Sequence, residues 1–317
     1  MASPIVIDAH MHIYETKAEG ERQKAGYEIW EYGTKQGVPF SRYSGDVDDV
    51  VAAMRQAGYA HAVSVNLFAV DLARKEAIVA LPPGLQGAER ARAISEIDTT
   101  MGDRLRAFNR WACEVARSHP DITPYVAMDP WAMSPGDNVV HLQELAGRRG
   151  ARGVKLHPVV QRFPPDDPRM LPIYRACVEL DLVVLSHSGT AKGAVQYAEP
   201  RAFAEILRRF PDLTLVLAHL GGGSWRQTAE LARAFPNVYF DCCEIVAWTG
   251  APNAPTDEQL ARLINEVGPQ RVMLGTDFPW YDLDHTVERV MALPRISREE
   301  KEGILGTNAI RILRLRV

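Results

Sequence analysis

The sequence predicts an α/β fold in which the chain forms one (β/α)8 TIM barrel with long insertions after strands 1 and 2. Eight short β-rich runs alternate with segments of helical spacing, which is the pattern of parallel strands joined by crossover helices. Several runs are nearly continuous in Val, Ile and Leu, as in strands covered on both faces. The length of 317 residues suits a barrel of roughly 250 residues that carries insertions. An open doubly wound sheet is the competing architecture, but no GxGxxG motif follows the first run.

The predicted strands follow one another along the chain and comprise residues 4–10, 61–68, 122–128, 151–157, 182–187, 213–219, 238–242 and 271–277. Four of the segments between them show clear helical spacing and end in Gly or Asp, namely residues 46–58, 171–181, 200–212 and 257–268. Each strand and the helix after it make one unit of the barrel.

Two connections, residues 13–60 and 69–121, are longer than the roughly 30 residues of a typical strand–helix–strand unit. Both follow the carboxyl ends of strands, which form the active face of a barrel. We therefore expect a single domain over residues 1–317 whose insertions build a substrate lid or a subunit contact. Such a contact would make a homodimer.

The composition favours small-molecule chemistry. With 46% hydrophobic residues, 24% charged residues and a net charge of −4, the chain gives no electrostatic reason to bind nucleic acid or an anionic membrane. We expect a soluble, cytoplasmic protein, because no apolar run approaches the roughly 18 residues of a membrane span and MASPIVIDAH does not read as a signal peptide. The four cysteines form no CxxC pair and are expected to be reduced and buried.

The stretch IDAHMHIYE ends the first predicted strand with His10 and His12, which point the same way because strand residues two apart share a face. Other strand ends deliver further polar side chains to the same rim: Lys155, His157, His187, His219 and Asp277. Imidazoles and a carboxylate suit Zn²⁺ or a similar first-row ion, and catalytic sites of this kind have three or four protein ligands. One histidine after a strand more often has a structural role, but several at one rim favour a metal site.

Five motifs in this order, IDAHMH, GVKLHP, LSHSG, LAHLGG and LGTDFPW, resemble those of the amidohydrolase superfamily, specifically its amidohydrolase-related (amidohydrolase 2) branch. The resemblance covers nearly the whole chain. This branch includes aminocarboxymuconate semialdehyde decarboxylase together with hydrolase, hydratase and lactonase relatives, all on a distorted (β/α)8 barrel.

The resemblance implies one divalent metal ion, most simply zinc with manganese as the alternative, bound by His10, His12 and His187. Asp277 would be a further ligand or the base that orients a metal-bound water, and His219 would lie next to that water. A bound cation lowers the pKa of its water toward about 7, so that a neighbouring carboxylate or imidazole can take the proton. Asp277 and His219 are therefore the expected catalytic residues.

Lys155 and His157 share one face of the fourth strand. In binuclear members of the superfamily a lysine on this strand is carboxylated and bridges two metal ions, and His187 and His219 could supply the second ion here. Because the branch is mostly mononuclear, we favour Lys155 and His157 as contacts to a substrate carboxylate or to the transition state. A structural ion pair is the remaining alternative for Lys155.

Arg42 and Trp280 are further candidates for substrate binding. A guanidinium suits an acid substrate, and Arg42 lies in the first insertion. Trp280 is one of several aromatic residues after strand ends that could line a pocket for a ring or seal the barrel top.

The glycines at 221–223 would allow close backbone approach or form a flexible turn. GRRGARG at 147–153 precedes the fourth strand and is expected to be a solvated turn on the opposite face.

The leading hypothesis is a metal-dependent hydrolase of a C–N or C–O bond, in which metal-bound hydroxide attacks a small, carboxylated or aromatic substrate. The alternative is a non-oxidative, metal-dependent decarboxylase of an aromatic or muconate-like acid. Some decarboxylases of this branch begin with Glu-x-His instead, so His10 makes the semialdehyde decarboxylase the closer lyase relative. A metal-free lactonase or a non-catalytic binding protein is the third reading.

Overall fold

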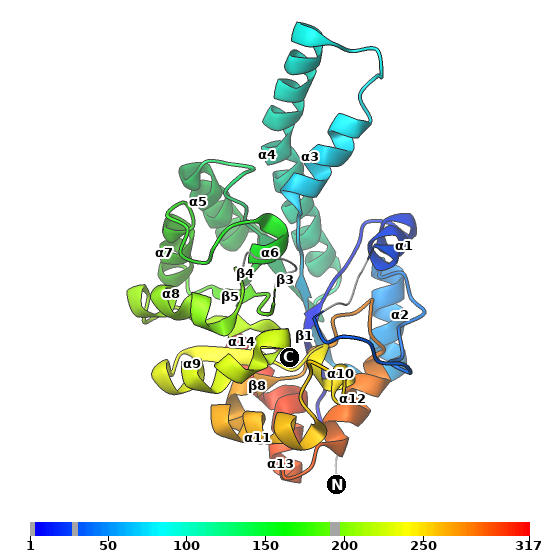
Figure 1. Ribbon diagram of the computed structural model, residues 1–317, viewed down its shortest axis with the longest axis vertical. Coiled ribbons are helices and arrows are strands. Elements are labelled where there is room, and N and C mark those ends of the chain that lie inside the picture. The colour runs from blue at the N-terminus through cyan, green and yellow to red at the C-terminus, as the bar shows by residue number, and fades with distance from the viewer. Residues whose placement is uncertain (1–3, 27–30, 191–196) are drawn as a thin grey trace.

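The computed structural model describes residues 4–26, 31–190 and 197–317, and it confirms the (β/α)8 barrel (Figure 1). Backbone hydrogen bonds join the two ends of the sheet, because the Ala9 N–H donates to the Leu274 carbonyl at 2.9 Å and the Asp277 N–H to the His10 carbonyl at 2.8 Å. Neighbouring strands are parallel and follow chain order: β1 (Ile7–Met11), β2 (His61–Val65), β3 (Ile122–Ala127), β4 (Gly153–Leu156), β5 (Val183–Ser186), β6 (Leu215–Leu217), β7 (Val238–Asp241) and β8 (Val272–Met273).

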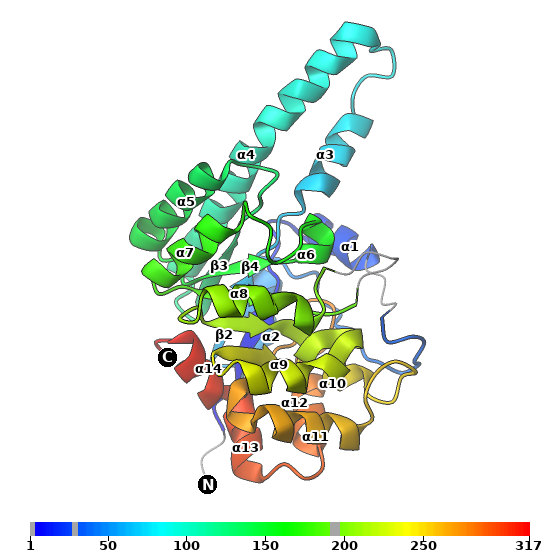
Figure 2. The same cartoon turned by 60° about the vertical axis from the view of Figure 1, so that its left-hand side comes forward.

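Helices surround the sheet in both views (Figures 1 and 2). They are α1 (Lys17–Ala25), α2 (Val47–Ala57), α3 (Val70–Val79), α4 (Gly87–Ser118), α5 (Pro135–Glu144), α6 (Pro158–Gln161), α7 (Leu171–Glu179), α8 (Ala204–Arg209), α9 (Thr228–Ala234), α10 (Ile245–Trp248), α11 (Asp257–Val267), α12 (Leu283–Ala292), α13 (Arg298–Glu302) and α14 (Asn308–Leu313). The four segments predicted to be helical contain α2, α7, α8 and α11.

Local sequence explains where these helices begin and end, as α2 illustrates. The Asp46 side chain accepts the Asp49 N–H at the first turn, which satisfies a donor that the helix itself leaves free. Val50 and Met54 are buried one turn apart on the face toward the sheet. Gly58 ends the helix in the left-handed conformation, with φ of 73°.

The two insertions add helices beside the barrel. Residues 13–60 contain α1 and α2, and residues 69–121 contain α3 and α4. In both views the hairpin of α3 and α4 projects from the barrel (Figures 1 and 2). Their use as a lid or a subunit contact remains a prediction.

The cysteines agree with a further expectation. All four cysteines are free and buried: Cys113, Cys177, Cys242 and Cys243. Among the helices in the described residues, none has both the length and the apolar character that crossing a membrane requires.

Strand packing inside the sheet depends on Gly153, and this gives a stability prediction. A Cβ atom at Gly153 would lie 2.5 Å from the Tyr125 ring, which is fully buried. We expect Gly153→Ala to lower the free energy of unfolding by about 1–3 kcal/mol, because overpacking forces neighbours to shift. Denaturant unfolding measures this. Gly147→Ala is the matched control, since nothing lies within 4 Å of a Cβ there; equal stability of both variants would contradict the packing argument.

Candidate metal and catalytic site

The centre of the site joins the end of β1 to the segment after β8. The His12 Nε2 lies 3.2 Å from the Asp277 Oδ1, and the His10 Nε2 lies 3.5 Å from the same oxygen. All three side chains are buried, and their potential ligand atoms lie within 4.8 Å of one another. Two imidazoles and a carboxylate are a donor set that first-row divalent ions use, so these residues fit the metal ion that the sequence predicts.

The backbone at both strand ends departs from regular geometry to bring these side chains together. The pairing of β1 with β2 shifts register between Asp8 and Met11, and such irregularities re-aim nearby side chains. Asp277 adopts φ of 58°, a left-handed conformation that few residues other than glycine tolerate. Asp8 accepts the N–H groups of His10 at 2.9 Å and Thr276 at 3.0 Å, which ties the two segments to each other.

Asp241, at the end of β7, orients the histidines from behind. Its carboxylate accepts from the His10 Nδ1 at 2.9 Å and from the His219 N–H at 2.8 Å. Burial alone would raise the pKa of Asp241, but the nearby His10 and its hydrogen bond lower that pKa to about 2. A carboxylate that binds Nδ1 fixes the ring and leaves Nε2 for a metal ion. Burial and the charge of Lys155 lower the pKa of His10 to about 4, so the ring is neutral at pH 7.

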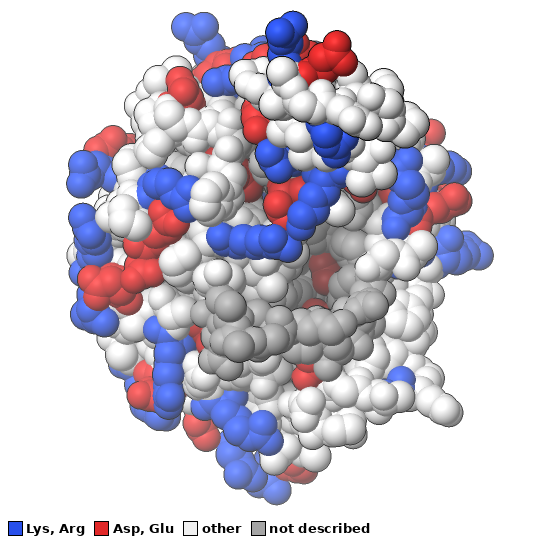
Figure 3. All heavy atoms as spheres, turned by 45° about the horizontal axis from the view of Figure 1, so that its top comes forward, with Lys and Arg blue, Asp and Glu red and all other residues white. Residues whose placement is uncertain are grey.

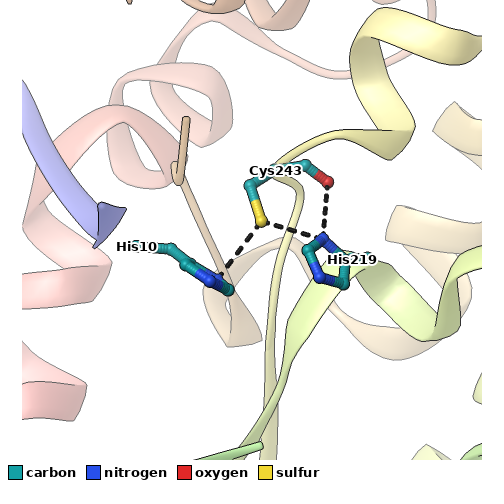
Figure 4. A group of neighbouring side chains, drawn as sticks. All are labelled: His10, His219 and Cys243. Atoms are coloured by element: carbon teal, nitrogen blue, oxygen red, sulfur yellow. Dashed lines mark hydrogen bonds between the residues drawn. The ribbon is translucent and has the colours of Figure 1, made fainter. Parts of the chain in front are cut away.

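His219 follows β6 and lies against Cys243 and Glu244. Its Nδ1 is 3.0 Å from the Cys243 Sγ, which also lies 3.3 Å from the His10 Nδ1 (Figure 4). The Glu244 Oε2 is 3.4 Å from the His219 Nδ1. Burial raises the pKa of the Cys243 thiol, so the sulfur is protonated at neutral pH and serves as a hydrogen-bonding neighbour. Two more sets of close ligand atoms arise here, His10–His219–Cys243 and His219–Glu244–Asp277.

The fourth and fifth strands contribute Lys155, His157 and His187. Lys155 is buried, with Nζ 3.0 Å from the His10 Nε2, and burial lowers its pKa. The His157 and His187 rings are stacked with centroids 4.0 Å apart, and the His187 ring lies 5.0 Å from that of His219. Within the described residues, the sets of three mutually close ligand atoms do not include His187. Its role as a metal ligand therefore remains a prediction.

The two candidate substrate contacts differ in position. The Trp280 ring lies 5.0 Å from that of His12 in an edge-to-face arrangement, beside the centre. Arg42 is exposed, and its guanidinium donates to the Tyr43 hydroxyl and to the Gln56 side chain, both at 3.2 Å. These partners hold Arg42 against the surface of α2 rather than against the histidines, so the structure gives no support to its role as a carboxylate clamp.

Glu31 joins the first insertion to the loops after β5 and β6. Its carboxylate accepts the N–H groups of Thr190 at 3.0 Å and Gly223 at 2.9 Å. A Cβ atom at Gly189 or Gly222 would lie 2.6 or 2.7 Å from the Glu31 carboxylate, which explains the need for glycine. The glycines at 221–223 were expected to allow close backbone approach, and Gly222 does so for the Glu31 carboxylate. The space-filling view shows a hollow in the molecular surface with acidic side chains inside it (Figure 3).

This contact supplies a prediction about the loops. Both N–H groups donate to the same oxygen, Oε2, so Glu31→Gln keeps an acceptor there but removes the negative charge, which weakens both bonds and costs about 1–3 kcal/mol. We expect unfolding free energy to fall by that amount and KM to rise, because the loops beside His219 lose their anchor. Glu15→Gln, an exposed change in the same insertion, should alter neither quantity. Wild-type stability of the Glu31 variant would contradict the anchoring role.

Sequence reasoning did not identify Asp8, Asp241, Cys243, Glu244 or Glu31. Asp241 carried a usable signal, since it lies next to the end of the predicted strand at 238–242, much as Asp277 ends the predicted strand at 271–277. Cys243 and Glu244 follow it directly. Glu31 carried none, because its partners are separated from it by a long stretch of chain whose path the sequence does not specify.

Residues 7–315 match the family model described as Amidohydrolase. The chain belongs to the amidohydrolase family. This confirms the resemblance seen in the five strand-end motifs and accounts for a histidine- and aspartate-rich centre at the barrel rim.

Two curated relatives bear the name 2-amino-3-carboxymuconate-6-semialdehyde decarboxylase. The amidohydrolase described here is 27% identical to the *Dictyostelium discoideum* protein over 197 residues, which are 52% of this chain and 54% of that one. It is 32% identical to the *Caenorhabditis elegans* protein over 120 residues, which are 34% of this chain and 29% of that one. The matches thus span about half or less of each relative.

Solved structures share the fold over nearly the whole chain. An uncharacterised TIM-barrel protein from *Bordetella bronchiseptica* has a TM-score of 0.66 at 22% identity and covers 98% of both chains. The 5-carboxyvanillate decarboxylase from *Sphingomonas paucimobilis* has a TM-score of 0.65 at 16% identity and covers 99% of this chain and 100% of its own. A dihydroxybenzoic acid decarboxylase from *Polaromonas* sp., solved with manganese and 2-nitroresorcinol, also has a TM-score of 0.65 at 16% identity, covering 100% of this chain and 98% of its own.

Proposed function

We propose that this amidohydrolase-family protein is a metal-dependent decarboxylase that removes CO2 non-oxidatively from a small aromatic or muconate-like acid. The observation that carries the proposal is the buried Lys155 Nζ, which lies 3.0 Å from the His10 Nε2 beside the His10, His12 and Asp277 donor set, because its N–H groups can donate to a substrate carboxylate. The names of the curated relatives favour the decarboxylase over the hydrolase, which reverses the order that the sequence alone suggested.

The proposed metal ligands are His10, His12 and Asp277, with His187 as a fourth. Zinc and manganese both accept such nitrogen and oxygen donors, and manganese is the ion named in the *Polaromonas* structure. When bound, the ion would supply positive charge that favours binding of an acid substrate.

The chain's own residues would hold the substrate and move one proton. Lys155 and Trp280 bind the acid and its ring, and the buried centre excludes water. Loss of CO2 breaks a C–C bond and leaves its electron pair on the substrate carbon, which must then take up a proton. His219 is the proposed proton donor, since Cys243 and Glu244 fix its Nδ1 side and leave Nε2 for proton transfer.

The test is a comparison of two substrate panels with the purified, metal-loaded protein. We expect CO2 release from at least one hydroxylated aromatic or muconate-like acid. When the reaction is run in D2O, one deuterium should be incorporated at the carbon that lost CO2. The second panel contains amides, esters and lactones of similar size. Turnover of that panel without CO2 release from the first would establish the hydrolase reading instead.

A further inference from the structure

A cavity lies near the amino-terminal ends of β3 and β4, whereas the metal-type ligands lie at the carboxyl ends of the strands. Its volume is about 650 Å³, within the range of small-ligand sites. Its walls come from the last turns of α4, the π-helical turn η1 (Leu145–Arg149), the first residues of β3 and the residues that lead into β4. The motif GRRGARG, at residues 147–153, forms one side of it.

Four arginines and two glutamates line this cavity, and the glutamates are already paired. Arg149 contacts Glu144 at 3.1 Å and Glu114 at 3.6 Å. Arg110, outside the cavity, also binds Glu144 at 2.9 Å, and its hydrogen bond is the main reason that the pKa of Glu144 falls to about 2. The two negative charges of the wall are therefore paired with Arg149 and Arg110.

The other three arginines, Arg117, Arg148 and Arg152, have exposed side chains. In the parts of the chain that the structure describes, none of their guanidinium groups makes an ion pair, a hydrogen bond or a ring contact. They come from three places, the end of α4, the turn η1 and the residue before β4. Gly150 turns the chain between the last two with φ of 83°, a conformation that suits glycine.

Three unpaired like charges around one cavity repel one another, and this is notable in a chain with 40 acidic and 36 basic residues. A bound anion would offset that repulsion. Guanidinium groups present paired N–H donors that match the oxygens of phosphate and carboxylate groups. Several guanidinium groups in one concave surface favour a ligand that carries more than one such group.

We propose that this cavity binds a small multivalent anion with two or three phosphate or carboxylate groups, at a site separate from the metal centre. The residues at 147–153 then form part of a ligand site rather than only a solvated turn. The proposal does not depend on the reaction that the metal centre performs, because it concerns binding by other residues.

Isothermal titration of the full, metal-loaded chain tests this with two probes, propane-1,2,3-tricarboxylate and propane-1,3-diyl bisphosphate, at constant ionic strength. We expect at least one probe to bind with Kd below about 1 mM. The triple variant Arg117→Gln/Arg148→Gln/Arg152→Gln should weaken that binding at least about tenfold, since charge-assisted bonds are the stronger ones. The probe that binds more tightly identifies phosphate or carboxylate as the preferred group.

A matched variant controls for net charge. Arg55, Arg175 and Arg209 are also exposed, and Arg55→Gln/Arg175→Gln/Arg209→Gln removes the same charge elsewhere. It should leave Kd within about twofold of wild type, because screened charges at a distance contribute little. The proposal is overturned if neither probe binds with a Kd below about 1 mM, if the first triple variant binds as wild type does, or if both triple variants weaken binding equally.

Discussion

Asp277→Asn should leave the protein folded but should cost it most of its bound metal ion and most of its turnover. The Asp277 Oδ1 is the oxygen that both His12 and His10 approach, at 3.2 and 3.5 Å. An amide has similar shape but no negative charge, and the charge stabilisation that a catalytic metal provides is worth several kcal/mol. We expect kcat/KM to fall by about 10³, which corresponds to roughly 4 kcal/mol.

Metal content after dialysis, measured by elemental analysis, is the direct readout. Wild-type protein stripped with a chelator should regain activity when manganese or zinc is returned, whereas the Asp277 variant should not. Asp284→Asn is the control, because Asp284 is exposed on α12 soon after the same loop. Stoichiometric metal together with wild-type turnover in the Asp277 variant would show that the metal-binding centre lies elsewhere.

The sequence was most informative about the order of the strands and the side chains at their ends. Strand residues two apart share a face, and parallel barrel strands end at one rim, so His10, His12 and Asp277 could be expected to meet despite their separation. These are local rules. They apply because the residues lie on or directly after regular strands.

The strand boundaries were overestimated where the chain leaves regular geometry to form the site. The predicted strand at 213–219 ends as β6 at Leu217, because His219 and Leu220 adopt φ of 60° and 48°. The predicted strand at 271–277 shortens to β8, and a Cβ at Gly275 would lie 2.8 Å from the His10 side chain. Hydrophobic patterns continue through such turns. They therefore indicate where the apolar run lies, but not the backbone conformation that positions the polar residue after it.

Contacts made by the insertions could not be predicted. Glu31 reaches the loops after β5 and β6 by a path that no periodicity encodes, and Arg42 folds onto α2 because Tyr43 and Gln56 offer nearby partners. Long connections carry the specificity of barrel proteins and lack the repeating pattern from which secondary structure is inferred. For the same reason, the substrate can be proposed only by chemical class.

His219→Asn should separate metal binding from proton transfer. The ring is buried, with Nδ1 3.0 Å from the Cys243 Sγ and 3.4 Å from the Glu244 Oε2. Asparagine keeps a polar side chain at this position but cannot exchange a proton near neutral pH, and general acid–base catalysis contributes about 10² to 10⁴ in rate. We expect kcat to fall by that factor while metal content and KM change little.

The outcome distinguishes a proton donor from a residue that only supports the centre. A supporting residue would lower metal content or raise KM in parallel with the loss of kcat, as removal of an orienting group does in other metal sites. His285→Asn, a change at a partly exposed histidine on α12, controls for the substitution itself. If the His219 variant kept more than about a tenth of wild-type kcat, the proton would have to come from another group. Lys155, whose buried Nζ lies 3.0 Å from the His10 Nε2, would be the next residue to replace.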